Sequence, residues 1–124
     1  MKTMETEIVV VAAGPAGLCA AVQAAEDGAQ VIVLEKSPVP GGAANMGMGP
    51  LGIGTKYQKD QMVDISVEKA FNMFMEYTHY QADARLVRRY FEMSGKTIEW
   101  LEDMGVRFAG AFKYFPKSEQ PWHI

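Results

Sequence analysis

Residues 7–42 read EIVVVAAGPAGLCAAVQAAEDGAQVIVLEKSPVPGG, and this stretch decides the fold class. Residues 8–11 form a short run of β-branched side chains, which is typical of a strand buried on both faces. Residues 15–27 are mostly small or helix-forming, and Gly28 follows them as a helix-ending residue. Residues 31–34 predict a second strand. The stretch therefore predicts a strand, a glycine turn, a helix and a second strand.

The glycine turn between the first strand and the helix has features of an anion site. A glycine at Gly14 lets the backbone approach a pyrophosphate, where a Cβ would collide with the ligand. Gly17 lets the helix pack closely on the strand, and Pro15 suits the first helical position because its missing N–H has no helical partner. The free N–H groups of the first helical turn attract an anion. This pattern predicts a dinucleotide-binding unit.

An acidic residue follows the second strand at the distance that such a unit requires. Glu35 comes 18 residues after Gly17, where a carboxylate accepts hydrogen bonds from an adenosine ribose. Its negative charge also opposes a 2′-phosphate, which disfavours NADP. One position departs from the usual fingerprint, because Ala12 stands where a first glycine is expected. The alternative to a nucleotide site is an ordinary strand–helix turn with incidental glycines.

Composition limits the class of protein. The chain has 124 residues and a net charge of −3, with acidic and basic residues interspersed, so no nucleic-acid-binding surface is indicated. Its single cysteine, Cys19, excludes an internal disulfide and a cysteine-based zinc cluster, and its alanine-rich surroundings predict a buried thiol. No secretory signal or stretch of transmembrane length is present in these residues. We therefore expect a cytoplasmic protein that binds no metal.

The sequence after residue 42 predicts a glycine-rich loop and then helices. Residues 43–55 are apolar and uncharged, which favours a segment that lines a ligand over a mobile loop, and residues 56–60 are polar and expected to be exposed. An apolar stripe at helical spacing predicts a helix over residues 64–78, with Asp64 or Ser66 as its cap. We divide the chain into a nucleotide-binding part, residues 1–55, and a helical part, residues 56–124.

A further helix is predicted to begin after Asp83, which is a suitable N-cap. Its spacing predicts inward-facing side chains at Leu86, Val87, Tyr90 and Phe91. Gly95 weakens the middle of this region, so Ser94 is expected to begin a separate helix. The residues from 106 onward predict a strand or irregular segment. Two strands alone leave sheet edges open, so we expect either further strands from this region or a homo-oligomer.

Several of these motifs, taken in order, resemble a known family. The segments AAGPAGL, VIVLEKSPVPGG and DARLVRRYFEMSGKTIEWLEDMGVRF, together with the glycine-rich segment to Thr55, resemble the amino-terminal part of FAD-dependent oxidoreductases. The closest subgroup is the fumarate reductase and succinate dehydrogenase flavoprotein type. The resemblance covers most of residues 7–108 and implies an α/β fold. It implies the opening βαβ of a Rossmann-like FAD-binding domain followed by helices, an incomplete domain.

The resemblance assigns cofactor-binding roles to particular residues. It places the backbone at the turn against the FAD pyrophosphate, Glu35 at the adenosine ribose and Lys36 beside the adenine. Some relatives attach FAD through a histidine at the position of Ala43, so the resemblance implies non-covalent FAD here. The implied set is Gly14, Pro15, Ala16, Gly17, Glu35, Lys36, Gly42, Ala43, Ala44, Gly47 and Gly49. The last two glycines are expected to approach the isoalloxazine ring, and no catalytic residue is expected in this chain.

Three functions stay open at this stage. The first is the FAD-binding portion of an oxidoreductase that transfers hydride through the flavin to an unsaturated carboxylate or similar alkene, inactive as this fragment. The second is an NAD-binding module, since Glu35 suits either ribose, although the glycine-rich segment argues against it. The third is a non-catalytic interaction or regulatory remnant, which Ala12 and the stop at Ile124 favour slightly. A small-molecule substrate is expected only in the complete protein.

Overall fold

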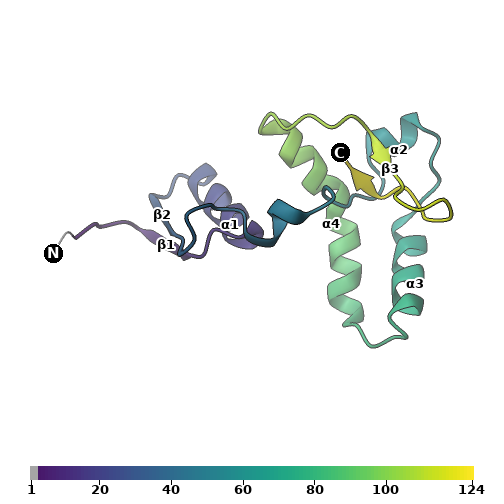
Figure 1. Cartoon of the computed structure of the whole chain (residues 1–124), viewed down its shortest axis with the longest axis horizontal. Coiled ribbons are helices and arrows are strands. Elements are labelled where there is room, and N and C mark those ends of the chain that lie inside the picture. The colour runs from purple at the N-terminus through teal and green to yellow at the C-terminus, as the bar shows by residue number, and fades with distance from the viewer. Residues whose placement is uncertain (1–2) are drawn as a thin grey trace. The chain divides into compact units, whose positions relative to one another are not determined.

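The structure, a computed structural model, describes residues 3–124 (Figure 1). The chain divides into two compact units, and the division falls between Gly47 and Met48. We call the part that ends at Gly47 the first unit and the part that begins at Met48 the second unit. In the described residues, no helix is long and apolar enough to cross a membrane.

The first unit contains the predicted β-α-β arrangement. Strand β1 (Ile8–Val11) is followed by helix α1 (Pro15–Glu26) and strand β2 (Val31–Leu34), and the two strands pair in parallel along their whole length. Pro15 takes the first helical position, and Gly28 has a φ of 92°, a left-handed conformation that ends a helix. The predicted strands, helix and chain order are therefore confirmed.

Burial in this unit differs from the sequence prediction. Val9, Val11 and Leu34 are 53%, 79% and 53% exposed, so the prediction of a strand buried on both faces is wrong for β1. Helix α1 contacts both strands, and alternate side chains of a two-stranded sheet point away from such a helix. The prediction of a buried thiol is also wrong, because Cys19 is exposed on α1.

Ala12, directly after β1, has a φ of 85°, a conformation that glycine adopts far more readily than alanine. Its N–H donates to the carbonyl oxygen of Leu34 at the end of β2 (2.7 Å), so the strained residue stays attached to the sheet. The unusual alanine in the fingerprint therefore occupies the position for which glycine is the better residue.

The helices of the second unit are α2 (Lys56–Asp60), α3 (Val67–Tyr77) and α4 (Ala84–Asp103), and the last two lie side by side (Figure 1). Ser66 caps α3 by accepting a hydrogen bond from the N–H of Lys69, and Asp83 caps α4, as predicted.

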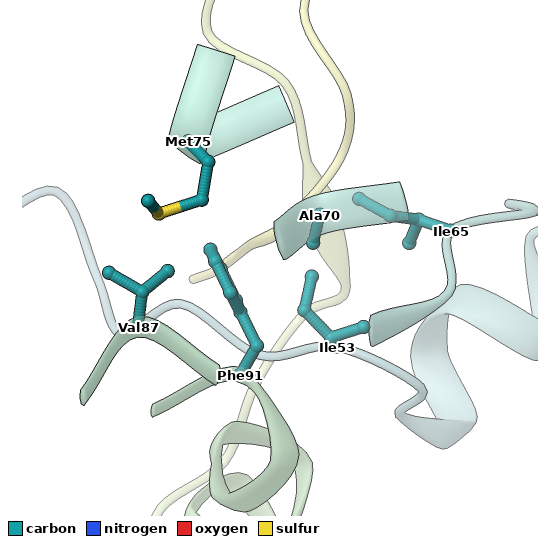
Figure 2. Packing of buried hydrophobic residues seen from close by; sticks show 6 residues of the cluster. All are labelled: Ile53, Ile65, Ala70, Met75, Val87 and Phe91. Atoms are coloured by element: carbon teal, nitrogen blue, oxygen red, sulfur yellow. The ribbon is translucent and has the colours of Figure 1, made fainter. Parts of the chain in front are cut away.

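The core of the second unit lies between α3, α4 and the glycine-rich segment. Phe91 lies at its centre, surrounded by aliphatic and methionine side chains (Figure 2). Its ring meets the edge of Phe74 at a centroid distance of 6.0 Å. The buried members of the cluster are Ile53, Ile65, Ala70, Met75, Val87 and Phe91.

Two sequence predictions for the region of helix α4 are wrong. Leu86 and Tyr90 are 70% and 51% exposed and line an apolar hollow of about 610 Å³, so only Val87 and Phe91 of the four predicted residues face inward. The predicted break at Ser94 is wrong, because α4 is continuous through it. Gly95 is needed for packing instead, since a Cβ there would lie 2.5 Å from the carbonyl oxygen of Ile53.

The carboxyl-terminal residues form a second, separate sheet. Strand β3 (Ala111–Phe112) pairs antiparallel with strand β4 (Trp122–His123), and neither joins the β1–β2 sheet. Strand β4 also forms a bridge with Leu51 of the glycine-rich segment. The predicted strand after residue 106 is therefore present, but it does not extend the first sheet.

We predict that Ala12→Gly stabilises the chain by about 1 kcal/mol, because it removes the cost of a left-handed alanine. The measurement is the free energy of unfolding from urea denaturation. Ala13→Gly is the matched control: Ala13 is 3% exposed and has no positive φ, so this variant is expected to be less stable than the original chain. If Ala12→Gly and Ala13→Gly lowered the free energy of unfolding equally, the backbone strain that we infer at Ala12 would be contradicted.

Candidate functional site

The turn between β1 and α1 leaves space beside the backbone. Gly14 has a φ of −74°, which any residue adopts, and a Cβ at this position would meet no atom within 4 Å. Neither the conformation nor packing within the chain therefore requires glycine here. No side chain caps α1, so the first-turn N–H groups of Ala16 and Gly17 are available to an acceptor. This open space next to free N–H groups fits a bound anion.

Gly17, by contrast, is required by packing within the chain. A Cβ at Gly17 would collide with the carbonyl oxygen of Ala12 and would lie 3.3 Å from Cγ1 of Val10. The helix therefore approaches the strand as closely as the sequence pattern predicts.

Ala13 connects the turn to the other two parts of the first unit. Its N–H donates to Oε2 of Glu35 (2.7 Å), and its carbonyl oxygen accepts from the N–H of Gly41 (2.7 Å). Gly41 is the N-cap of a 3-10 helix, η1 (Gly42–Met46). Both main-chain groups of one buried residue therefore hold the end of β2 and the start of η1 at the turn.

Glu35 has a structural role as well as a suitable position for ribose. Its Oε1 accepts from the N–H of Ser37 (2.8 Å), while Oε2 accepts from Ala13. These two hydrogen bonds, the one from Ser37 being the larger effect, hold the pKa of the carboxyl group below its ordinary value of 4.5. Each oxygen keeps a further lone pair, so the carboxylate retains acceptor capacity for a ligand hydroxyl.

The structure brings several of the predicted residues together. A Cβ on Gly42 would lie 3.4 Å from the Cα of Gly14, so η1 starts beside the turn, and Glu35 reaches the turn through Ala13. Gly47 ends η1 by donating its N–H to Ala44 (3.0 Å). Five other members of the predicted set are exposed in the first unit: Pro15, Ala16, Lys36, Ala43 and Ala44.

Gly49 belongs to the second unit, where packing within the chain explains its residue type. Its φ is 96°, and a Cβ there would collide with the carbonyl oxygen of His123. The Tyr114 hydroxyl also donates to the carbonyl oxygen of Met48, next to Gly49. The part of the glycine-rich segment that belongs to the second unit is therefore held against β4. The role of Gly49 toward a flavin stays a prediction.

A buried polar side chain that the sequence did not reveal holds the next part of this segment. Gln58 is 1% exposed, so the prediction that residues 56–60 are exposed is wrong at this position. Its Oε1 accepts from the N–H of Gly54 (2.7 Å), and its Nε2 donates to the carbonyl oxygens of Gly52 (2.9 Å) and Gln120 (2.8 Å). The Thr55-x-x-Gln58 spacing of a capping box was the available signal.

We predict that Gly17→Ala destabilises the chain by about 1–3 kcal/mol, because its Cβ forces the helix away from the strand. Gly14→Ala is the control and should change the free energy of unfolding by less than about 1 kcal/mol, since its Cβ meets open space. Urea denaturation of both variants measures the difference. A stable Gly17→Ala protein would contradict the close approach of α1 to Ala12.

We predict that Glu35→Gln lowers the melting temperature at pH 7, because an amide offers one acceptor oxygen where two N–H groups need one each. The folded-state pKa is depressed, so the contribution of Glu35 is present above pH 4.5 and is lost as the pH falls through the folded-state value. The variant should therefore show a shallower loss of stability below pH 4.5. Glu5→Gln, at an exposed position, is the control.

Known structures share this chain's fold. The open conformation of a flavocytochrome c3 fumarate reductase superposes with a TM-score of 0.86 at 31% sequence identity, over 95% of this chain and 21% of that one. A 3-ketosteroid-Δ4-(5α)-dehydrogenase from Rhodococcus jostii RHA1 superposes with a TM-score of 0.75 at 37% identity, over 83% of this chain and 22% of that one.

Sequence comparisons agree with the structural ones. The chain is 38% identical to a vinyl phenol reductase of Lactiplantibacillus plantarum over 118 residues, which are 95% of this chain and 24% of that protein. It is 36% identical to an NADH:fumarate oxidoreductase of Klebsiella pneumoniae over 103 residues, 81% of this chain and 11% of that protein. The chain thus spans a quarter or less of these relatives. Residues 7–123 match the model of the FAD binding domain, and the chain belongs to this family of fumarate reductase-like flavoproteins.

Proposed function

We propose that the first unit binds the ADP portion of FAD. The observation that carries this proposal is the open space at Gly14, a glycine that neither backbone conformation nor internal packing requires. A pyrophosphate in that space would accept hydrogen bonds from the backbone at Ala16 and Gly17 and would lie at the positive end of α1. Pro15, at the first helical position, adds no unpaired N–H group to the turn.

The remaining predicted residues of the unit complete this proposal. The free lone pairs of Glu35 accept from the adenosine ribose, and the exposed Lys36 lies beside the adenine. Gly42, Ala43 and Ala44 approach the pyrophosphate and flavin side, and Gly47 approaches the isoalloxazine ring. Because alanine at position 43 cannot form a bond to the flavin, we propose non-covalent FAD. Gly49 is proposed to approach the isoalloxazine ring.

For the complete protein we propose a flavin-dependent oxidoreductase. FAD, when bound, accepts and donates hydride, and the protein supplies binding, orientation and electrostatics. The names of the relatives, vinyl phenol reductase and NADH:fumarate oxidoreductase among them, support a substrate with an activated carbon–carbon double bond, such as an unsaturated carboxylate. We assign no catalytic residue to this chain and propose that it is inactive by itself. The substrate, a cytoplasmic location and a homo-oligomer stay predictions.

The test is a titration of the purified chain with FAD and, in parallel, with NAD, following flavin fluorescence and thermal stability. We expect FAD to be preferred and to stabilise the chain by about 2.7 kcal/mol at a hundredfold excess over its dissociation constant. Gly14→Ala should keep the stability of the free protein but weaken FAD binding by tenfold or more, because its Cβ fills the open space.

The outcomes separate the three functions. Binding of NAD alone would support an NAD module, for which Glu35 is equally suited. Failure to bind either dinucleotide, together with a stable oligomer, would support a non-catalytic remnant and argue against an FAD site in this chain. Undiminished FAD binding by Gly14→Ala would contradict a cofactor site at the turn.

A further inference from the structure

His123 is a fully buried histidine whose ring and main chain both contact the glycine-rich segment. Its exposed fraction is 0%, and its ring packs edge-on against Tyr57 and Phe108 at centroid distances of 5.8 and 6.0 Å. Its ring nitrogens have two hydrogen-bond partners, the carbonyl oxygen of Pro121 at Nδ1 (3.0 Å) and the hydroxyl of Thr55 at Nε2 (2.8 Å). The imidazole is therefore a fixed polar group inside the second unit.

These partners determine the tautomer. A carbonyl oxygen can only accept, so Nδ1 carries the hydrogen and donates it to Pro121. In the neutral ring Nε2 then accepts the hydroxyl hydrogen of Thr55. The Thr55 oxygen in turn accepts from the N–H of Gln58 (3.4 Å), which caps α2. In a charged ring Nε2–H would donate to the Thr55 oxygen instead, and the Thr55 hydroxyl hydrogen would lose the acceptor that the neutral ring offers.

His123 contacts the glycine-rich segment at successive positions. The carbonyl oxygen of Pro121 that receives Nδ1–H also accepts from the N–H of Gly52 (2.8 Å). The N–H of His123 donates to the carbonyl oxygen of Pro50 (2.9 Å), and its own carbonyl oxygen occupies the space that a Cβ on Gly49 would need. A Cβ on Gly52 would lie 3.0 Å from Cε1 of the ring. One residue thus holds the segment from Gly49 to Thr55.

Several effects act on the pKa of His123 in opposite directions. Burial lowers it from its ordinary value of 6.5, while hydrogen bonding to the backbone at Pro121 and Pro50 and, last, the carboxylate of Glu102 on α4 raise it by smaller amounts. Glu102 is itself paired with Lys56 of α2 (2.7 Å) and accepts from the hydroxyl of Tyr57 (2.5 Å). The Glu102 carboxylate is thus already engaged by two groups of α2.

We propose that His123 is a positioning residue whose neutral imidazole fixes the segment from Gly49 to Thr55, and that protonation of the ring releases this segment. The proposal rests on the proposed function only where it concerns FAD, because Gly49 is the residue that we place near the isoalloxazine ring. A cation at Nε2 would face the Thr55 hydroxyl in a site without solvent.

The sign of the pH effect follows from the direction of the pKa shift. The folded-state pKa of His123 is lowered, so the unfolded chain binds the proton more readily. The stability that the neutral ring supplies is fully present above pH 6.5 and is lost as the pH falls through the folded-state value. Loosening of the segment is therefore expected on the acidic side of neutrality.

The experiment uses the whole chain and its two histidines. Amide exchange protection factors, corrected for intrinsic rates, are measured at Gly52, Ile53 and Gly54 from pH 7.5 to 5. In the original chain they should fall by about tenfold, the equivalent of one hydrogen bond of ~1.4 kcal/mol, while that of Ala12 in the first unit stays unchanged. His79→Gln, at an exposed position, should behave like the original chain.

His123→Gln should abolish the pH dependence, because the glutamine amide does not titrate in this range. An unchanged pH dependence in His123→Gln would overturn the proposal. If this variant does not fold, nitrogen NMR of the original chain decides: a neutral ring protonated at Nδ1 at pH 7.5 supports the proposal. A ring protonated at Nε2, or charged at that pH, contradicts it.

A separate readout tests the consequence for the cofactor. The dissociation constant of FAD is measured at pH 7.5 and 5.5 for the original chain, His79→Gln and His123→Gln. We expect FAD binding to weaken at the lower pH except in His123→Gln. No FAD binding by the original chain at either pH would refute the proposed function, whereas the exchange experiment would still decide whether His123 holds the segment.

Discussion

The two main-chain hydrogen bonds of Ala13 organise the first unit. They attach the glycine turn to Glu35 at the end of β2 and to Gly41 at the start of η1. One of these bonds is accepted by the side chain of Glu35 and the other joins two main-chain groups, so the buried Ala13 cannot move without breaking one of them. The open space at Gly14 lies directly beside this fixed residue, and Ala12 with its positive φ lies on the other side of it. The diphosphate site that we propose here would therefore be formed mainly by backbone groups.

The second unit follows the same rule with different groups. Its glycine-rich segment has few side-chain atoms of its own, so hydrogen bonds from Gln58 and Ser94 and the contacts with β4 hold it in place. The amide of Ile53 donates to the Ser94 hydroxyl (3.0 Å) where Gly95 allows the segment to approach α4. In both units a glycine allows two backbone segments to approach closely, while hydrogen bonds from polar groups elsewhere in the unit hold those segments in position.

The resemblance in the order of its motifs indicated the FAD family. Local patterns in the sequence were sufficient for the β-α-β unit and the cap at Asp83, and they narrowed the cap of α3 to Asp64 or Ser66. These features depend on neighbouring residues, through strand propensity, glycine spacing and side-chain caps. The burial of His123 could not be predicted, because its partner Thr55 lies far along the chain and only the fold brings the two together. Gln58 had a local signal in its capping-box spacing, but its contact with Gln120 comes from the fold. The continuity of α4 through Gly95 was missed for the same reason, since the packing that favours glycine there comes from Ile53. The exposed Leu86 and Tyr90 show that helical spacing identifies an apolar face of a helix but does not predict whether other residues cover that face.

The bare face of the two-stranded sheet has a consequence for handling the protein. Val9, Val11 and Leu34 present β-branched and aliphatic side chains to water on strands whose outer edges carry free peptide groups. Such a surface favours intermolecular strand pairing, and the pairing rate rises with concentration. Charge repulsion between chains opposes this pairing only weakly, because the net charge is −3 and the isoelectric point is near 5.3. Colloidal solubility of the chain should therefore be poorest in mildly acidic, concentrated solutions.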